Sequence, residues 1–285
     1  MKPKSLFLPL IALSVVLVFT ACSSKEERLQ KKAKAIHAKA LTLDSHTDTP
    51  LMLMREGFDI GVRNDPRNRG GRLDFPRMQE GGLDAAFFAV FLGQGSRTPE
   101  AYEVAHQRAL VIFDHIYRAV GEHPDMAEIA LTPDDAYRLK REGKRAIYIG
   151  VENGYPLGED LGILQTYYDL GARYLGLVHS RNNQICDSST DRDGEEHGGL
   201  SAFGREVIRE MNRLGMMVDV SHASDKAFYD VIRTSEAPVI ASHSNARAIA
   251  EHPRNLDDEM LKTLAANGGV IQLCVLSSYV KNLPP

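Results

Sequence analysis

Short apolar segments alternate with helical patterns through most of this chain, and this alternation constrains the fold more than any other feature. Each segment is too short for a helix and is flanked by glycine, proline or polar residues, which is typical of buried β-strands. Between the segments, apolar residues at helical spacing, such as Val207, Met211 and Leu214, predict helices. Seven strands are predicted, at residues 40–43, 85–92, 146–151, 173–178, 216–220, 239–241 and 269–275. The alternation indicates parallel strands joined by crossover helices.

Composition narrows the class of protein. The 285 residues are 43% hydrophobic and 25% charged, which excludes disordered and fibrous architectures. Lys and Arg number 34 against 38 Asp and Glu, and the basic residues are scattered, so no nucleic-acid partner is expected. Three cysteines do not make a disulfide framework. Without an internal repeat or a change of composition, residues 36–285 are predicted to form one domain.

The N-terminus has the pattern of an export signal. A short basic start precedes an apolar run over residues 6–19, and small residues lie directly before Cys22. This pattern predicts a signal peptide over residues 1–21. A Cys after a small residue resembles the lipobox of bacterial lipoproteins, so we expect a lipidated Cys22 and a polar tether over residues 22–35. The expected location is the bacterial cell envelope, with a membrane partner contacted through the lipid anchor.

Residues of the kind that bind metals follow five of the predicted strands. In both architectures that parallel strands build, a doubly wound sheet or a (β/α)₈ barrel, chemistry lies at the carboxyl ends of the strands. A barrel brings all these ends near one centre, whereas the outer strands of an open sheet diverge, so the barrel is favoured. The residues are His46 with Asp48, then Glu152, His179, His222 and His243.

Imidazoles and carboxylates without cysteine suit a borderline metal ion such as Zn²⁺. These residues exceed one tetrahedral coordination shell, which indicates two ions with a carboxylate between them. Such a pair, about 3.5–4 Å apart, deprotonates a shared water that attacks a carbonyl, as in amide or ester hydrolysis. His179 is equally compatible with contacting a substrate. The remaining histidines are expected at the surface or in packing: His37, His106, His115, His123, His197 and His252.

Eight ordered motifs resemble the membrane dipeptidase (renal dipeptidase) family of the amidohydrolase superfamily. They are Asp-Ser-His-Thr-Asp at 44–48, Gly-Gly at 81–82, Gly-Val-Glu-Asn-Gly at 150–154, His-Ser-Arg-Asn at 179–182, Gly-Leu-Ser with a further Gly at 199–204, Asp-Val-Ser-His at 219–222, the segment 238–244 ending in Ser-His-Ser, and Arg-Asn at 254–255. The resemblance implies zinc-dependent hydrolysis of dipeptides, including those with a C-terminal D-residue, by a bridging hydroxide.

The resemblance also assigns the metal ligands. His46 and Asp48 match the ligands of the family's first zinc, and Glu152 matches the carboxylate that bridges the two ions. His222 and His243 match the ligands of the second zinc. Family members often dimerise, so the resemblance includes a homodimer among the expected partners.

Two further residues acquire roles from the resemblance. His179 matches the histidine that contacts the substrate and the tetrahedral intermediate. Arg254 matches the arginine that binds the free carboxylate of the dipeptide, a role that suits the two-pronged guanidinium.

The C-terminal end departs from the family pattern. The family continues to an eighth strand with a Gly-x-Asp-Phe-Asp-Gly type motif, whose Asp handles the proton of the water and the leaving amine. This chain contains no such motif. We therefore expect a (β/α)₈ TIM-type barrel of the metal-dependent hydrolase kind that lacks its eighth strand, in a truncated product or a fragment.

Two alternatives remain open. One is another amidohydrolase, such as a deaminase or a lactonase, although His-x-Asp after the first strand and Arg254 argue against it. The other is an inactive or non-catalytic surface lipoprotein that binds metal or peptide, which the missing motif favours.

Overall fold

The computed structural model describes residues 24–68 and 71–281. The chain divides into two compact units, residues 1–40 and 41–285. The predicted signal peptide and Cys22 lie outside the described residues. No helix among the described residues is both long enough and apolar enough to cross a membrane.

The described part of the first unit is helix α1, Lys25–Lys39. Ser24 begins it with a capping box, in which the Ser24 side chain accepts from the backbone N–H of Glu27 and the Glu27 carboxylate accepts from Ser24. Its residues are all exposed. Most of the segment predicted as a tether is therefore helical, and the helix continues beyond residue 35.

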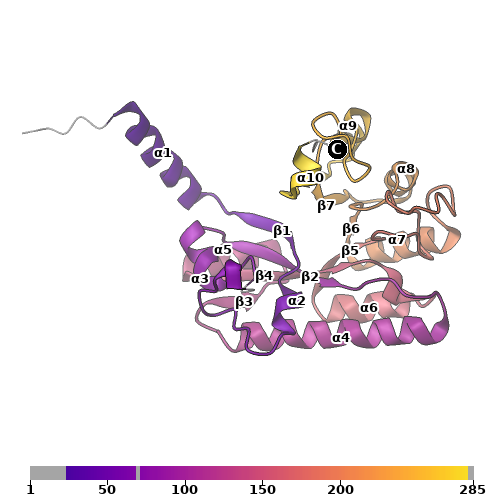
Figure 1. The fold of residues 1–285 in the computed structure, drawn as a ribbon, viewed down its shortest axis with the longest axis horizontal. Coiled ribbons are helices and arrows are strands. Elements are labelled where there is room, and N and C mark those ends of the chain that lie inside the picture. Colours follow the sequence, from indigo (N-terminus) through magenta and orange to yellow (C-terminus); the bar gives the residue numbers. More distant parts are fainter. Residues whose placement is uncertain (1–23, 69–70, 282–285) are drawn as a thin grey trace, which may run out of the picture. The chain divides into compact units, whose positions relative to one another are not determined.

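The second unit is built on a parallel sheet whose strands curve into a nearly closed barrel. Its strands are β1 Leu43–Thr47, β2 Ala85–Phe91, β3 Ala127–Ile129, β4 Arg145–Glu152, β5 Ala172–Gly176, β6 Met217–Asp219, β7 Ile240–Ser244 and β8 Val270–Leu273. The hydrogen-bonded order is β1-β2-β4-β5-β6-β7-β8, and β3 pairs with β4 beside this path. Figure 1 follows this order in colour, from indigo to yellow. The predicted α/β barrel class is confirmed.

Helices connect the strands. They are α2 Pro50–Leu53, α3 Phe75–Gly81, α4 Pro99–Gly121, α5 Pro133–Glu142, α6 Gly162–Asp169, α7 Ala202–Leu214, α8 Asp225–Thr234, α9 Asp258–Ala266 and α10 Ser277–Val280, with 3₁₀ turns at Pro66–Asn68 and Tyr155–Leu157. Polar caps begin several of them: the Thr98, Ser201 and Ser224 side chains each accept from a backbone N–H of the first turn.

The seven predicted strands are all present, and they form the path of the barrel. The strand that the sequence did not indicate is β3, which has three residues, contains the polar Glu128 and pairs with only one neighbour. The first predicted strand is shifted, because β1 begins at Leu43 and extends to Thr47. Its polar residues are held in the strand by pairing with β2.

The core lies on the central strands, and the exposure rises toward one end of the sheet. Every residue of β4 is buried. In contrast, Val270 and Leu273 of β8 are 53% and 73% exposed. Among the described residues, β8 pairs with β7, and no ladder joins it to β1.

Candidate metal centre

The predicted metal ligands lie at the carboxyl ends of the strands. His46 is the fourth residue of β1, Glu152 ends β4, and His243 lies within β7. His179 and His222 each follow a strand by three residues, after β5 and β6.

Short side-chain turns shape three of these strand ends. Oδ1 of Asp44 accepts from the backbone N–H of His46 at 3.0 Å, and Oδ1 of Asp219 accepts from the N–H of Ser221 at 3.0 Å. Asn153 Oδ1 accepts from the N–H of Tyr155 at 3.2 Å. Each of these bonds spans two residues and turns the backbone, so the side chains beside it are directed into the mouth of the barrel.

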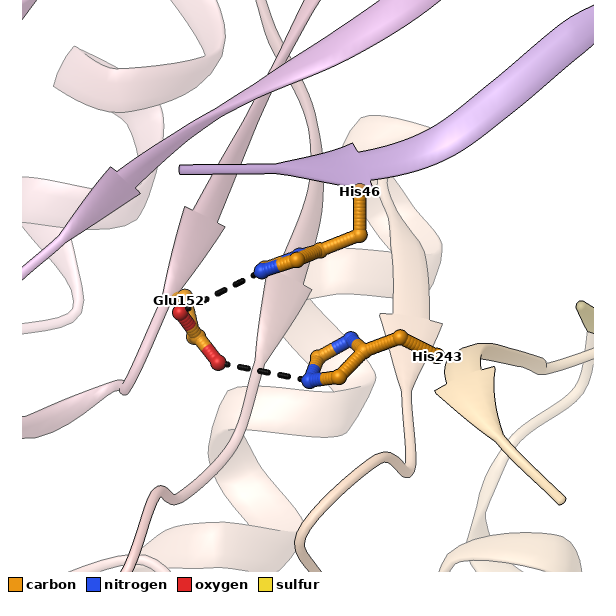
Figure 2. A group of neighbouring side chains, drawn as sticks. All are labelled: His46, Glu152 and His243. Carbon is orange, nitrogen blue, oxygen red and sulfur yellow. Dashed lines mark ion pairs between the residues drawn. The ribbon is translucent and has the colours of Figure 1, made fainter. Parts of the chain in front are cut away.

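The carboxylate of Glu152 is the centre of the cluster. Its Oε1 lies 3.1 Å from Nε2 of His222, 3.4 Å from Nε2 of His243 and 3.8 Å from Nε2 of His179. Its Oε2 lies 3.4 Å from Nε2 of His46. Figure 2 shows His46 and His243 approaching this carboxylate from two different strands. Four imidazole nitrogens therefore surround one buried carboxylate.

The histidine rings also contact one another. The rings of His46 and His243 are stacked with centroids 3.9 Å apart, and those of His179 and His222 are 4.2 Å apart. Nε2 of His222 and Nε2 of His243 are 3.0 Å apart. Two neutral rings in such a contact share one hydrogen, so at least one nitrogen presents its lone pair.

Backbone strain is concentrated at this site. Among the described residues, the non-glycine residues with positive φ are Asn153 at 80° and His222 at 74°. Such conformations cost of the order of 1 kcal/mol or more and persist where the surroundings impose them. Asn153 is held by its amide, which donates to the carbonyl of Leu92 and accepts from Asn183. The strained positions are therefore His222, a predicted ligand, and Asn153, which directly follows Glu152.

Burial and mutual contacts set the charges in the cluster. Burial opposes the charge of Glu152, but hydrogen bonding, most of all from His222, prevails and holds its pKa well below the ordinary value. Burial lowers the pKa of His222 far below its usual value, and it also lowers those of His243 and His179. For His46, burial is outweighed by Tyr174, Asp48 and Glu152, which raise its pKa well above 6.5.

The donor set fits a metal ion. Two groups have ligand atoms within 4.8 Å of one another: His46, Glu152 and His243, and Glu152, His179 and His222. They share Glu152, as a bridging carboxylate would. Neutral imidazoles and a carboxylate, without a thiolate, are the ligands that borderline divalent ions such as Zn²⁺ prefer.

Asp48 and Arg254 lie differently from the other predicted residues. The Asp48 side chain is 61% exposed and its Oδ1 is 3.7 Å from Nε2 of His46, so it stands at the rim, outside both groups. Arg254 is buried and donates from Nη2 to the backbone carbonyl of His243 at 3.1 Å. Its Nε has no hydrogen-bond partner among the described residues.

Three buried partners of the ligands were not predicted. The Tyr174 hydroxyl lies 2.9 Å from Nδ1 of His46, and the Ser242 hydroxyl lies 2.7 Å from Nδ1 of His243. Asp219 in turn accepts from the Ser242 hydroxyl at 2.6 Å. The one available signal was an acidic residue at the end of an apolar strand, Asp219 in the motif Asp-Val-Ser-His, where only the histidine was assigned a role.

A nearly closed parallel barrel with imidazoles and a carboxylate gathered at its strand ends defines a metal-binding α/β-barrel protein. The chain belongs to the membrane dipeptidase family (peptidase family M19), whose sequence model matches residues 30–284. The predicted resemblance is thereby confirmed, and membership of this metallopeptidase family implies a metal cofactor.

Named relatives agree with this family. The chain is 35% identical to Dipeptidase tcpJ of Claviceps purpurea over 237 residues, which cover 81% of this chain and 55% of that protein. It is 34% identical to Dipeptidase 3 of Mus musculus over 256 residues, which cover 87% of this chain and 50% of that protein. The chain thus spans about half the length of the curated relatives it matches.

Solved structures share the fold. The probable dipeptidase PvdM from Pseudomonas aeruginosa superposes with a TM-score of 0.82 at 31% identity, covering 90% of this chain and 65% of that one. A metallo peptidase from Rhodobacter sphaeroides was solved with a phosphinate mimic of the dipeptide L-Ala-D-Ala. It superposes with a TM-score of 0.72 at 29% identity, covering 84% of this chain and 75% of that one.

Proposed function

We propose that this chain hydrolyses dipeptides, including those with a C-terminal D-residue, with two zinc ions bridged by Glu152. The observation that carries the proposal is the buried Glu152 carboxylate with four imidazole Nε2 atoms within 3.8 Å, in a member of the membrane dipeptidase family. The proposed ligands are His46, Asp48, Glu152, His222 and His243.

When bound, the two ions would supply a hydroxide nucleophile and polarise the scissile carbonyl. Glu152 keeps the ligands together, because its Oε2 faces His46 and its Oε1 faces His222 and His243. His179 is the most exposed of the four rings, with 28% of its side chain accessible, which suits a group that faces the substrate. Its Nδ1 lies 2.9 Å from the Ser180 hydroxyl, which can hold the hydrogen on Nε2 for donation to the developing oxyanion.

Arg254 would restrict the substrate to dipeptides. Its guanidinium is buried beside His243, and within the described part of the chain its Nε–H has no partner, so it can offer a charged donor to the free carboxylate of a short peptide. A C-terminal D-residue is supported by the Rhodobacter sphaeroides relative, which was solved with a mimic of L-Ala-D-Ala.

The test compares amino-acid release from L-Ala-D-Ala and zinc content in the parent, in Glu152→Gln and in Glu128→Gln. Glu128 is the matched control, because the same chemical change occurs on an exposed carboxylate bonded to Arg138. We expect about two zinc ions and turnover in the parent and in the control, with both lost in Glu152→Gln. A zinc-loaded parent without turnover would instead favour a metal-binding or peptide-binding protein.

Arg254 is tested with the same substrate carrying an amidated C-terminus. The parent is expected to prefer the free carboxylate by at least about tenfold in kcat/KM, the effect of a single charge-assisted hydrogen bond worth about 1.5–3 kcal/mol. Arg254→Met should remove this preference. Equal preference in the two proteins would refute the assigned role.

We also propose that the chain is anchored at a bacterial cell envelope by a lipid on Cys22. The basic start, the apolar run and the small residue before Cys22 support this. Mass spectrometry of the membrane fraction should find the lipid on Cys22, and Cys22→Ser should release the protein. A homodimer, which is common in the family, is a further proposal that sedimentation velocity tests.

A further inference from the structure

We propose that Asp219 is a positioning residue that acts through the Ser242 hydroxyl to fix the hydrogen of His243 on Nδ1, which leaves Nε2 free for the metal. The inference rests on the proposed metal centre and adds to it a buried relay that selects one tautomer of one ligand. The Asp219 side chain bonds to Ser242 and not to the Glu152 cluster, so it reaches His243 only through the Ser242 hydroxyl.

Asp219 is buried and acts as an acceptor. It ends β6 and is 1% exposed. Its Oδ1 accepts from the backbone N–H groups of Ser221 and Ser242, both at 3.0 Å. Its Oδ2 accepts from the Ser242 hydroxyl at 2.6 Å. Three donors therefore converge on one carboxylate, and their geometry fixes which oxygen faces Ser242.

The Ser242 hydroxyl transmits this polarity to His243. A serine hydroxyl has a single hydrogen, and here it is used on Asp219. Its 2.7 Å contact with Nδ1 of His243 must then be one in which the imidazole N–H donates to Oγ. Since a neutral imidazole has one N–H, Nε2 of His243 presents its lone pair. That nitrogen lies 3.4 Å from Glu152 and 3.0 Å from His222, inside the cluster.

The other two buried ligands do not have such a relay. Nδ1 of His46 contacts the hydroxyl of Tyr174, which can donate or accept and so permits either tautomer. Nδ1 of His222 is buried and has no hydrogen-bond partner among the described residues. Of these three ligands, His243 is therefore the one whose tautomer the protein selects before any metal arrives.

Asp219→Asn reverses the polarity of the relay without changing its shape. Because two backbone N–H groups point at Oδ1, the amide oxygen takes that position and the amide NH₂ faces Ser242. The NH₂ then donates to Oγ, the Ser242 hydrogen turns to Nδ1 of His243, and the imidazole hydrogen moves to Nε2. An Asn in place of the Asp of a catalytic triad selects the wrong histidine tautomer in the same way.

The experiment determines which nitrogen of His243 carries the hydrogen in the metal-free full chain, by ¹⁵N NMR of histidine-labelled protein. Assignment comes from the signal lost in His243→Gln. We expect Nδ1–H in the parent and in Ser45→Ala, and Nε2–H in Asp219→Asn. Ser45→Ala is the matched control, because it removes an equally buried hydroxyl that donates to the Ser242 carbonyl rather than to a histidine.

Zinc affinity, measured by competition with a chelator, gives the second readout. Asp219→Asn should weaken zinc binding by about 10- to 100-fold, the usual effect of losing an outer partner of a metal ligand. Ser45→Ala should bind as the parent does. If Asp219→Asn does not fold, Ser242→Ala tests the same relay, and His243 should then no longer hold its hydrogen on Nδ1 alone.

Three results would overturn the proposal: Nε2–H on His243 in the metal-free parent, an unchanged tautomer in the folded Asp219→Asn or Ser242→Ala variant, or equal zinc loss in Ser45→Ala. The proposed function fails separately, because a zinc-loaded parent that does not cleave dipeptides would leave the tautomer measurement intact.

Discussion

Gly150 lies in the middle of β4 and faces a tyrosine ring, and replacing it with alanine gives a sharp test of how the core supports the site. A Cβ at this position would fall 2.1 Å from Cζ of Tyr174 and 2.4 Å from both Cε atoms. The Tyr174 ring is fully buried, and its hydroxyl contacts Nδ1 of His46. Strand propensity alone predicts that Gly→Ala stabilises by about 0.5–1 kcal/mol, so sterics and propensity give opposite signs.

The steric effect should dominate. An overlap of more than about 1 Å with a rigid buried ring forces the ring or the backbone to move, at about 1–3 kcal/mol. Loss of the hydrogen bond to His46 adds about 1 kcal/mol. The sum, about 2–4 kcal/mol, corresponds to a fall in Tm of about 4–16 °C for a chain of this size.

A double-mutant cycle isolates this cause. Gly150→Ala is measured by urea unfolding in the parent and in the Tyr174→Ala background, where the ring is gone. We expect the substitution to be nearly neutral in the second background, so the coupling free energy equals the whole cost in the parent, about 2–4 kcal/mol. Additive costs would refute the reasoning, since the destabilisation would then not come from the ring.

Three further predictions follow from buried polar contacts and from the metal. Asp84 accepts from Lys140 and Thr42, and although burial opposes its charge, these bonds keep its pKa below 3.8. The stabilisation by the Asp84 carboxylate is therefore present above about pH 4 and is lost as the pH falls through its lowered pKa. Asp84→Asn should cost about 1–3 kcal/mol of unfolding free energy at pH 7 and progressively less in acid. A constant difference between the two proteins in urea unfolding across this pH range would contradict the prediction. Asn153→Ala should destabilise the protein by about 1 kcal/mol more than Asn153→Gly does. Both variants lose the hydrogen bonds of the amide, but only alanine has a Cβ that disfavours the backbone at φ 80°. Equal urea midpoints of the two variants would show that the backbone is not strained. Chelation of the metal should lower the Tm of the parent and leave that of Glu152→Gln unchanged. The loss in unfolding free energy is about 2.7 kcal/mol when zinc had been present at 100 times its Kd. The same shift of Tm in both proteins would show that the ion binds elsewhere.

The sequence predicts the barrel because its central strands are buried on both faces. β2 and residues 146–151 of β4 are continuous apolar runs, and the pattern locates both strands within a residue or two. β3 was not predicted, because its three residues include Glu128 and show no such apolar pattern. The limits of β1 are displaced because Asp44 and His46 are polar, and only pairing with β2 keeps them in a strand.

The metal cluster is predictable for a similar reason. A titratable residue directly after a buried strand is costly without a partner, so Glu152 and His243 stand out from the sequence alone. The supporting residues do not, because serine, tyrosine and aspartate at strand ends have many ordinary uses. Only the distances in the folded chain connect Asp219 to Ser242 and Tyr174 to His46.

The position of the centre within the sheet sets how its ligands respond to local opening. Glu152 ends β4, a fully buried strand with neighbours on both sides, whereas His243 lies on β7 beside the exposed β8. Amide exchange should therefore be slower around Glu152 than around His243. An ion held between them would be released when β7 opens locally, long before the barrel unfolds, so the lifetime of the bound metal would report on local opening of β7 rather than on global stability.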